Sequence, residues 1–88
     1  MGVQPATFLY FPHYEIYQNE KSGEYVYQDG QWWINDRRPP AGVSVAALNE
    51  SPSVVITLQD APKREHAAVK QAYPTNWNGK PAVVAAAP

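Results

Sequence analysis

The sequence has no cysteine and only two histidines among its 88 residues. The lack of cysteine excludes disulfide bonds and thiolate metal sites, so side-chain packing alone must stabilise the fold. The histidines, His13 and His66, do not stand at the spacing of a zinc motif. Neither a glycine-rich phosphate loop nor a nucleophile elbow occurs. We therefore expect no metal site, no cofactor and no enzymatic activity.

An excess of charge and a long apolar run are also missing. Seven lysines and arginines against eight aspartates and glutamates give a net charge of −1, which disfavours general binding to nucleic-acid phosphates. No apolar stretch approaches the roughly 20 residues that a membrane-spanning helix needs. No signal peptide is visible. The sequence is therefore compatible with a periplasmic or secreted protein whose leader has been removed, and equally with a cytoplasmic protein.

Aromatic residues are abundant: the chain has six tyrosines, three tryptophans and two phenylalanines, most of them between residues 8 and 33. Each aromatic side chain can bury roughly 150–250 Å², so a few of them give a short chain a core. Residues 1–7 lack periodicity, and residues 78–88 are rich in alanine and proline. We predict that both ends are disordered tails and that residues 8–77 form a single domain.

The strongest local pattern is a β-hairpin centred on Asp29-Gly30. An Asp-Gly pair between two segments of β-forming residues favours a two-residue turn, because both central residues must tolerate a positive φ. This turn places Tyr27 opposite Trp32 and Val26 opposite Trp33. One face of the hairpin, with Tyr25, Tyr27, Trp32 and Ile34, is predicted to lie in the core. The opposite face is mostly polar around Val26 and Trp33.

Three further strand segments are predicted around this hairpin. Residues 8–11 are stopped by Pro12, which predicts an edge strand or an extended arm, because proline cannot donate to a strand ladder. Residues 13–17 and 53–58 alternate in the way of strands. Residues 43–48 are compatible with either a strand or a single helical turn.

One helix is predicted near the C-terminus. Residues 63–72 contain strong helix formers, with Asp60 as the expected N-cap and Pro74 as the terminator. The whole pattern predicts an α+β domain: a small antiparallel β-meander of three to four strands with one C-terminal helix packed on it.

Four features in a fixed order carry a resemblance to a known family. They are the aromatic entry at residues 10–17, the hairpin at residues 23–32, the strand at residues 54–58 and the pair Tyr73-Pro74. In this order they resemble a family of small, uncharacterised, usually exported bacterial proteins with a tyrosine-rich entry and a Tyr-x-Tyr…Gly-x-Trp hairpin. The resemblance implies a bacterial source and a cell-envelope setting, and it implies no activity.

The candidate binding residues are Tyr17, Val26 and Trp33, with Arg37 and Arg38 at the rim. Trp33 on the polar face of the hairpin is compatible with an exposed platform for a sugar ring, a proline-rich peptide or a partner subunit. The alternative, a core position beneath the predicted helix, is favoured because a sheet this small needs cover on one face. The two arginines are compatible with bidentate binding of a carboxylate or phosphate. They also fit a solvated loop with one arginine stacked on a tryptophan.

These features favour a non-catalytic interaction or structural module of the bacterial cell envelope, with a protein, a peptide or a cell-wall glycan as its partner. The alternative is a cytosolic accessory domain that self-associates or binds a partner protein through the same strand face or an open sheet edge. The sequence does not determine the oligomeric state.

Overall fold

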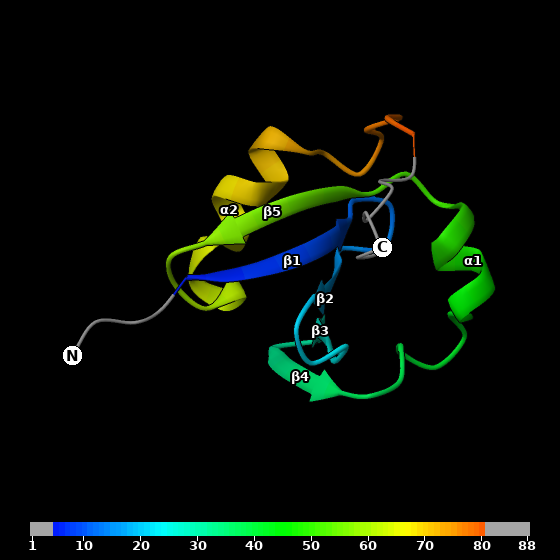
Figure 1. Cartoon of the computed structure of the whole chain (residues 1–88), viewed down its shortest axis with the longest axis horizontal. Coiled ribbons are helices and arrows are strands. Elements are labelled where there is room, and N and C mark those ends of the chain that lie inside the picture. The colour runs from blue at the N-terminus through cyan, green and yellow to red at the C-terminus, as the bar shows by residue number, and fades with distance from the viewer. Residues whose placement is uncertain (1–4, 81–88) are drawn as a thin grey trace, which may run out of the picture.

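The computed structural model describes residues 5–80, which form one antiparallel sheet and two helices. The elements in chain order are β1 (Ala6–Phe11), β2 (Ile16–Asn19), β3 (Tyr25–Asp29), β4 (Trp32–Asp36), α1 (Val45–Glu50), β5 (Val54–Leu58) and α2 (Pro62–Ala72). The five strands are ordered β4-β3-β2-β1-β5, so β1 to β4 form a meander and β5 returns beside β1 (Figure 1). The predicted class, α+β with an antiparallel meander and a C-terminal helix, is confirmed. No helix in this part of the chain has the length and apolar character to cross a membrane.

Strand β1 lies inside the sheet, where the sequence predicted an edge strand or an extended arm. It pairs with β2 on one side and with β5 on the other. Pro12 is compatible with an interior strand, because it comes after Phe11, the last paired residue of β1, and no ladder hydrogen bond is needed from it. The predicted N-terminal tail is also too long, since Ala6 and Thr7 pair with Leu58 and Thr57. The other residues of the predicted tails, apart from 5 and 78–80, lie outside the described residues.

The β3–β4 hairpin forms as predicted, but its register differs by two positions. Tyr27 lies opposite Ile34, and Asp29 lies opposite Trp32, so the two-residue turn is Gly30-Gln31. Gly30 has a φ of +63°, as expected for a turn with glycine at its first central position. A shift of two residues returns each side chain to the same face of a strand. The predicted faces of the hairpin are therefore retained although the predicted pairs are wrong.

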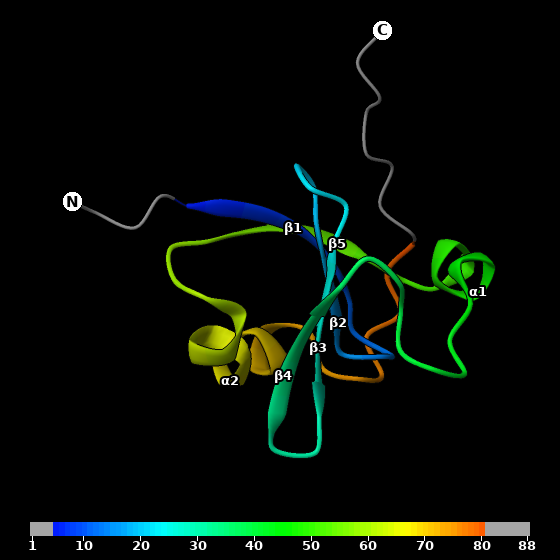
Figure 2. The same cartoon turned by 90° about the horizontal axis from the view of Figure 1, so that it is seen from below.

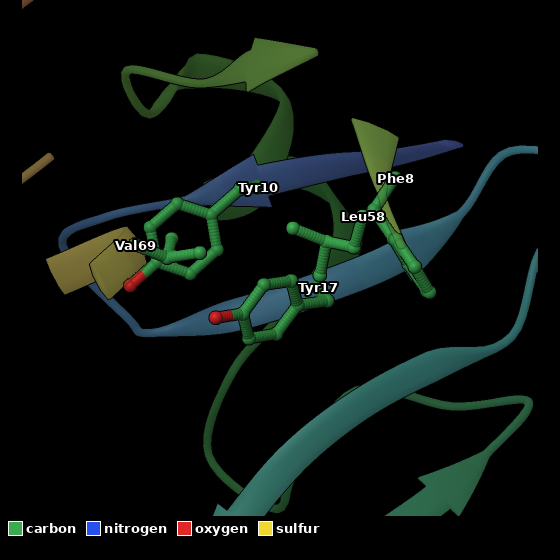
Figure 3. Close-up of a cluster of buried hydrophobic side chains, with 5 residues drawn as sticks. All are labelled: Phe8, Tyr10, Tyr17, Leu58 and Val69. Carbon is green, nitrogen blue, oxygen red and sulfur yellow. The ribbon is translucent and has the colours of Figure 1, made fainter. Parts of the chain in front are cut away.

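The two helices lie on either side of strands β2 to β4 (Figure 2). Helix α2 covers one face of the sheet, over a cluster of buried side chains drawn in Figure 3: Phe8, Tyr10, Tyr17, Leu58 and Val69. Helix α1 contributes to a second cluster, made of Phe11, Ile16, Tyr25 and Leu48. The alternation of side chains along β1 and β2 sends successive residues to the two clusters.

Trp32 was predicted to lie in the core, but it is 68% exposed. It shares a face with Tyr25 and Tyr27, yet it stands next to the turn of the hairpin. Figure 2 shows that this turn projects away from α1, the helix on that side. A side chain on the core-facing side of a hairpin is therefore not buried when it lies next to the turn, beyond the reach of the helix that covers that side.

The ends of the two helices also depart from simple expectation. Residues 43–48 were compatible with a strand or a helical turn, and the structure has a helix, α1, in this segment. The Ser44 hydroxyl caps its N-terminus by accepting a hydrogen bond from the Ala47 N–H over 3.0 Å. The N-cap of α2 is Ala61 and not Asp60, because Pro62 already occupies the first helical position. The Glu65 carboxylate instead accepts the Asp60 N–H over 2.6 Å.

Candidate functional site

A hollow of about 330 Å³ lies between the β3–β4 hairpin and the start of α2. The side chains that give it its chemistry are Asn19, Glu24, Val26, Trp33, Asn35 and Lys63. We call it the Trp33 groove. Two amides, one carboxylate and one ammonium group therefore surround an apolar wall. Its volume is at the lower end of the range of small-molecule sites, about 300–1,000 Å³.

Trp33 belongs both to this groove and to the packed layer beneath α2. Its ring is half-buried and lies 5.1 Å from the His66 ring, edge to face, and 6.3 Å from the Tyr17 ring. Helix α2 therefore covers the face of the hairpin that carries Trp33, which is the core position predicted as one of the two alternatives for this residue. The ring nevertheless lines the open groove, so coverage by α2 and access to a small ligand are compatible here.

The structure brings Tyr17, Val26 and Trp33 together on one face of the sheet. Tyr17 pairs with Val26 across β2 and β3, and both pack in the cluster beneath α2. Tyr17 has no exposed surface, so it supports the groove from within and does not itself reach a ligand. Val26 and Trp33 line the groove.

Arg37 and Arg38 do not join this site. They follow β4 in an exposed loop, where the backbone N–H of Arg38 donates to the Asp36 carboxylate over 3.3 Å. Within residues 5–80, neither guanidinium group makes an ion pair or stacks on Trp32 or Trp33. The two side chains are thus exposed, as in the solvated-loop interpretation, but the stacking on a tryptophan that this interpretation included does not occur within residues 5–80.

A polar network lies behind the groove, between α2 and the turn after β1. The Tyr17 hydroxyl lies 2.7 Å from His66 Nδ1, and His66 Nε2 lies 2.9 Å from Glu15 Oε1. Because an ionised carboxylate can only accept, Nε2 of His66 donates to Glu15; in the neutral imidazole, Nδ1 then accepts from the Tyr17 hydroxyl. Lys70 Nζ lies 3.5 Å from the same carboxylate oxygen. The network joins β2, the turn and two positions of α2.

Glu15 occupies a strained position in this network. Its φ of +55° is the only positive φ of a residue other than glycine in the described chain. The left-handed conformation costs roughly 1–2 kcal/mol for an ordinary L-residue. His66 and Lys70 hold the carboxylate in place, and the Glu15 N–H donates to the Pro12 carbonyl over 3.3 Å. The contacts to α2 therefore offset the strain and fix the turn against the helix.

Glu15, His66 and Tyr17 stand in the order carboxylate, imidazole, hydroxyl, as in a proton relay. The hydroxyl of this relay is not available as a nucleophile. The Tyr17 hydroxyl is inside the core, and desolvation raises the pKa of the phenol, with further contributions from Tyr10 and Glu15. The phenol therefore stays protonated at neutral pH. No three His, Cys, Asp or Glu side chains within residues 5–80 converge to hold a metal ion. Within residues 5–80, the arrangement ties the turn and β2 to α2, and its hydroxyl is enclosed in the core.

The sequence alone did not identify this network. Glu15 and His66 are separated by 51 positions, so no local motif connects them. One pattern does place His66 toward the core: Pro62, His66 and Val69 are the buried residues of α2, at helical spacings of four and three. That stripe predicts a buried histidine, but not its partners.

Comparison with protein-family models, with curated proteins and with solved structures finds no match.

Proposed function

We propose that this chain is a non-catalytic binding module of the bacterial cell envelope, and that the Trp33 groove holds one unit of a cell-wall glycan. The observation that carries the proposal is the half-buried indole of Trp33 beside the side chains of Asn19, Glu24 and Asn35 in one hollow. The envelope setting is supported only by the resemblance of residues 8–74 to exported bacterial proteins.

The chemistry of the lining favours a sugar over a peptide. A sugar ring offers an apolar face of C–H groups to an indole, and hydroxyl or acetamido groups to amides and carboxylates. The amides of Asn19 and Asn35 each donate and accept, and the Glu24 carboxylate accepts. Recognition of a proline-rich peptide needs an extended groove lined by several aromatic rings. Here the second ring of the lining, Phe8, is almost fully buried.

The network behind the groove makes the apolar wall rigid. Trp33 packs on His66, and His66 is held at both ring nitrogens by Tyr17 and Glu15. A wall that is already ordered in the free protein loses little conformational entropy on binding. This pre-organisation suits a small ligand, which has few contacts with which to offset such a loss.

The proposal is tested by titrating the ¹⁵N-labelled full chain with a β-1,4-linked N-acetylglucosamine tetramer. We expect backbone amide shifts to change at Asn19, Val26 and Lys63. The variant Asn35→Ala removes one hydrogen-bonding side chain from an exposed strand position, which we expect to weaken binding about ten-fold.

The matched control is Trp32→Ala, which removes the neighbouring, largely exposed indole on the opposite face. It should leave the dissociation constant unchanged. Absence of shift changes at millimolar tetramer, or changes confined to the face that carries Leu9 and Val55, would contradict the proposal. A response to a proline-rich peptide alone would reassign the groove to a peptide ligand.

A further inference from the structure

The two edges of the sheet differ in how they are protected. Edge strand β4 ends in Asp36, and Arg37, Arg38 and two prolines follow it. Charged side chains and prolines at an edge oppose pairing with another strand. Edge strand β5, Val54–Leu58, contains neither a charge nor a proline. Only β5 therefore has the composition of a strand that accepts a partner.

The outer side of β5 has no strand partner within residues 5–80. It pairs with β1 alone, and Figure 1 shows it at the border of the sheet. Alternate residues of such a strand direct their N–H and C=O groups away from the sheet. On the face opposite α2, Val55 is 43% exposed and Thr57 is also exposed. Two exposed β-branched side chains thus accompany the open row of backbone groups.

We propose that two copies of this chain associate through β5, antiparallel, about a two-fold axis at Ile56. Ile56 then faces Ile56 of the second copy, Val55 faces Thr57, and Val54 faces Leu58. The two five-stranded sheets become one continuous sheet, and each open edge satisfies the backbone groups of the other.

The occupant is a second copy because β5 is complementary to itself in this register. Residues directly opposite each other share a face, so the half-buried Val54 and Ile56 stay on the α2 side and the exposed Val55 and Thr57 stay on the other. Every pair joins β-branched or apolar side chains. The nearest charge, Asp60, falls opposite Pro52 of the second copy, so no like charges meet within the paired segment.

The test measures the mass of the full chain by sedimentation equilibrium over a range of concentrations. We expect the wild-type protein to reach twice its mass of 9.8 kDa as concentration rises. In Val55→Lys/Thr57→Lys, each lysine lies directly opposite a lysine of the second copy. Two pairs of like charges should weaken the dimer about ten-fold or more.

The matched control changes the same two exposed positions. In Val55→Lys/Thr57→Glu, each lysine lies opposite a glutamate, so the dimer should persist with wild-type affinity or better. A monomeric wild-type protein at millimolar concentration would overturn the proposal, as would a double-lysine variant that dimerises normally. Loss of the dimer in both variants would overturn the two-fold register.

A second measurement does not depend on how the variants fold. Hydrogen exchange of the wild-type chain is followed at low and high protein concentration. The outward amides of β5 should gain protection only at high concentration, while those of β4 stay unchanged. Equal exchange of β5 amides at both concentrations would contradict the proposed interface. If instead the amides of β4 gain protection at high concentration, the two copies associate through the opposite edge of the sheet and not through β5.

Discussion

The two faces of the sheet are stabilised by different means. The face beneath α2 buries His66 and joins it to Tyr17 and Glu15 by hydrogen bonds. The face beside α1 buries Leu48 with Phe11, Ile16 and Tyr25, and no buried histidine or ion pair lies in that cluster. The apolar cluster contributes through area removed from water, whereas the polar network sets the direction in which side chains point. The candidate site lies on the face with the network.

The contrast is sharpest between two neighbouring tyrosines beneath α2. The rings of Tyr10 and Tyr17 lie 4.5 Å apart, and both are fully buried. The Tyr17 hydroxyl bonds to His66, while the buried Tyr10 hydroxyl has no hydrogen-bond partner among residues 5–80. The same chemical group therefore contributes to stability at one position and costs stability at the next.

The largest expected effect comes from the apolar cluster. Leu48→Ala removes the only fully buried side chain of α1, and we expect a loss of about 3 kcal/mol in the free energy of unfolding, from lost burial and the cavity left behind. Urea denaturation monitored by circular dichroism measures it. Val45→Ala, at an exposed position of the same helix, should change stability by less than about 0.5 kcal/mol. Equal effects of both variants would show that α1 does not hold this cluster together.

The second effect is a loss of folding stability at alkaline pH, caused by the two buried tyrosines beneath α2. Burial raises the pKa of Tyr10 and Tyr17 above the ordinary value of about 10, with Glu15 adding to the shift at both. Above about pH 10 the unfolded chain loses these two protons while the folded chain keeps them. Their contribution is complete below that pH and declines as pH rises, by about 1.4 kcal/mol per pH unit for each phenol.

Denaturant unfolding at about pH 9 and about pH 11 measures this slope. The variant Tyr17→Phe should remove about half of the decline in unfolding free energy that the two phenols cause between these pH values. Lysines titrate in the same range, so the difference between the wild type and the variant is the informative quantity. An identical pH dependence in both proteins would show that Tyr17 ionises as readily in the folded chain as in the unfolded one.

The smallest effects separate the two tyrosines themselves. Tyr17→Phe leaves His66 Nδ1 buried without a partner, so we expect a loss of about 2 kcal/mol at neutral pH. Tyr10→Phe removes a hydroxyl that has no partner in the described part of the chain, so stability should rise by about 1 kcal/mol or stay unchanged. Both are measured by thermal and urea unfolding. A destabilised Tyr10→Phe protein would show that its hydroxyl is satisfied in solution.

Local patterns were sufficient for much of the fold. The turn glycine at position 30 placed the β3–β4 hairpin, and alternation assigned its faces correctly. The interior position of β1 could not be predicted, because Pro12 gives the same local pattern after an edge strand and after a central one. The exposure of Trp32 could not be predicted, because it depends on how the hairpin turn lies relative to α1, which the strand pattern does not show.

The candidate site was predicted only in part. Val26 and Trp33 follow from the hairpin alone, and both line the groove. Asn19 and Lys63 reach the groove from other elements, which no hairpin pattern can indicate. Arg37 and Arg38 are adjacent to the hairpin in sequence, but neither lines the groove.

Local patterns in the chain were enough to predict the class of fold, the hairpin, the C-terminal helix and the faces on which the aromatic rings lie. Two-residue and 3.6-residue periods are local properties, so they can be read without knowledge of distant contacts. Packing between distant segments set the hairpin register, the burial of Tyr17, the contact of His66 with Glu15 and the unprotected edge at β5. These features depend on contacts between segments far apart in sequence, and packing sets such contacts only once the whole sheet and its helices are in place.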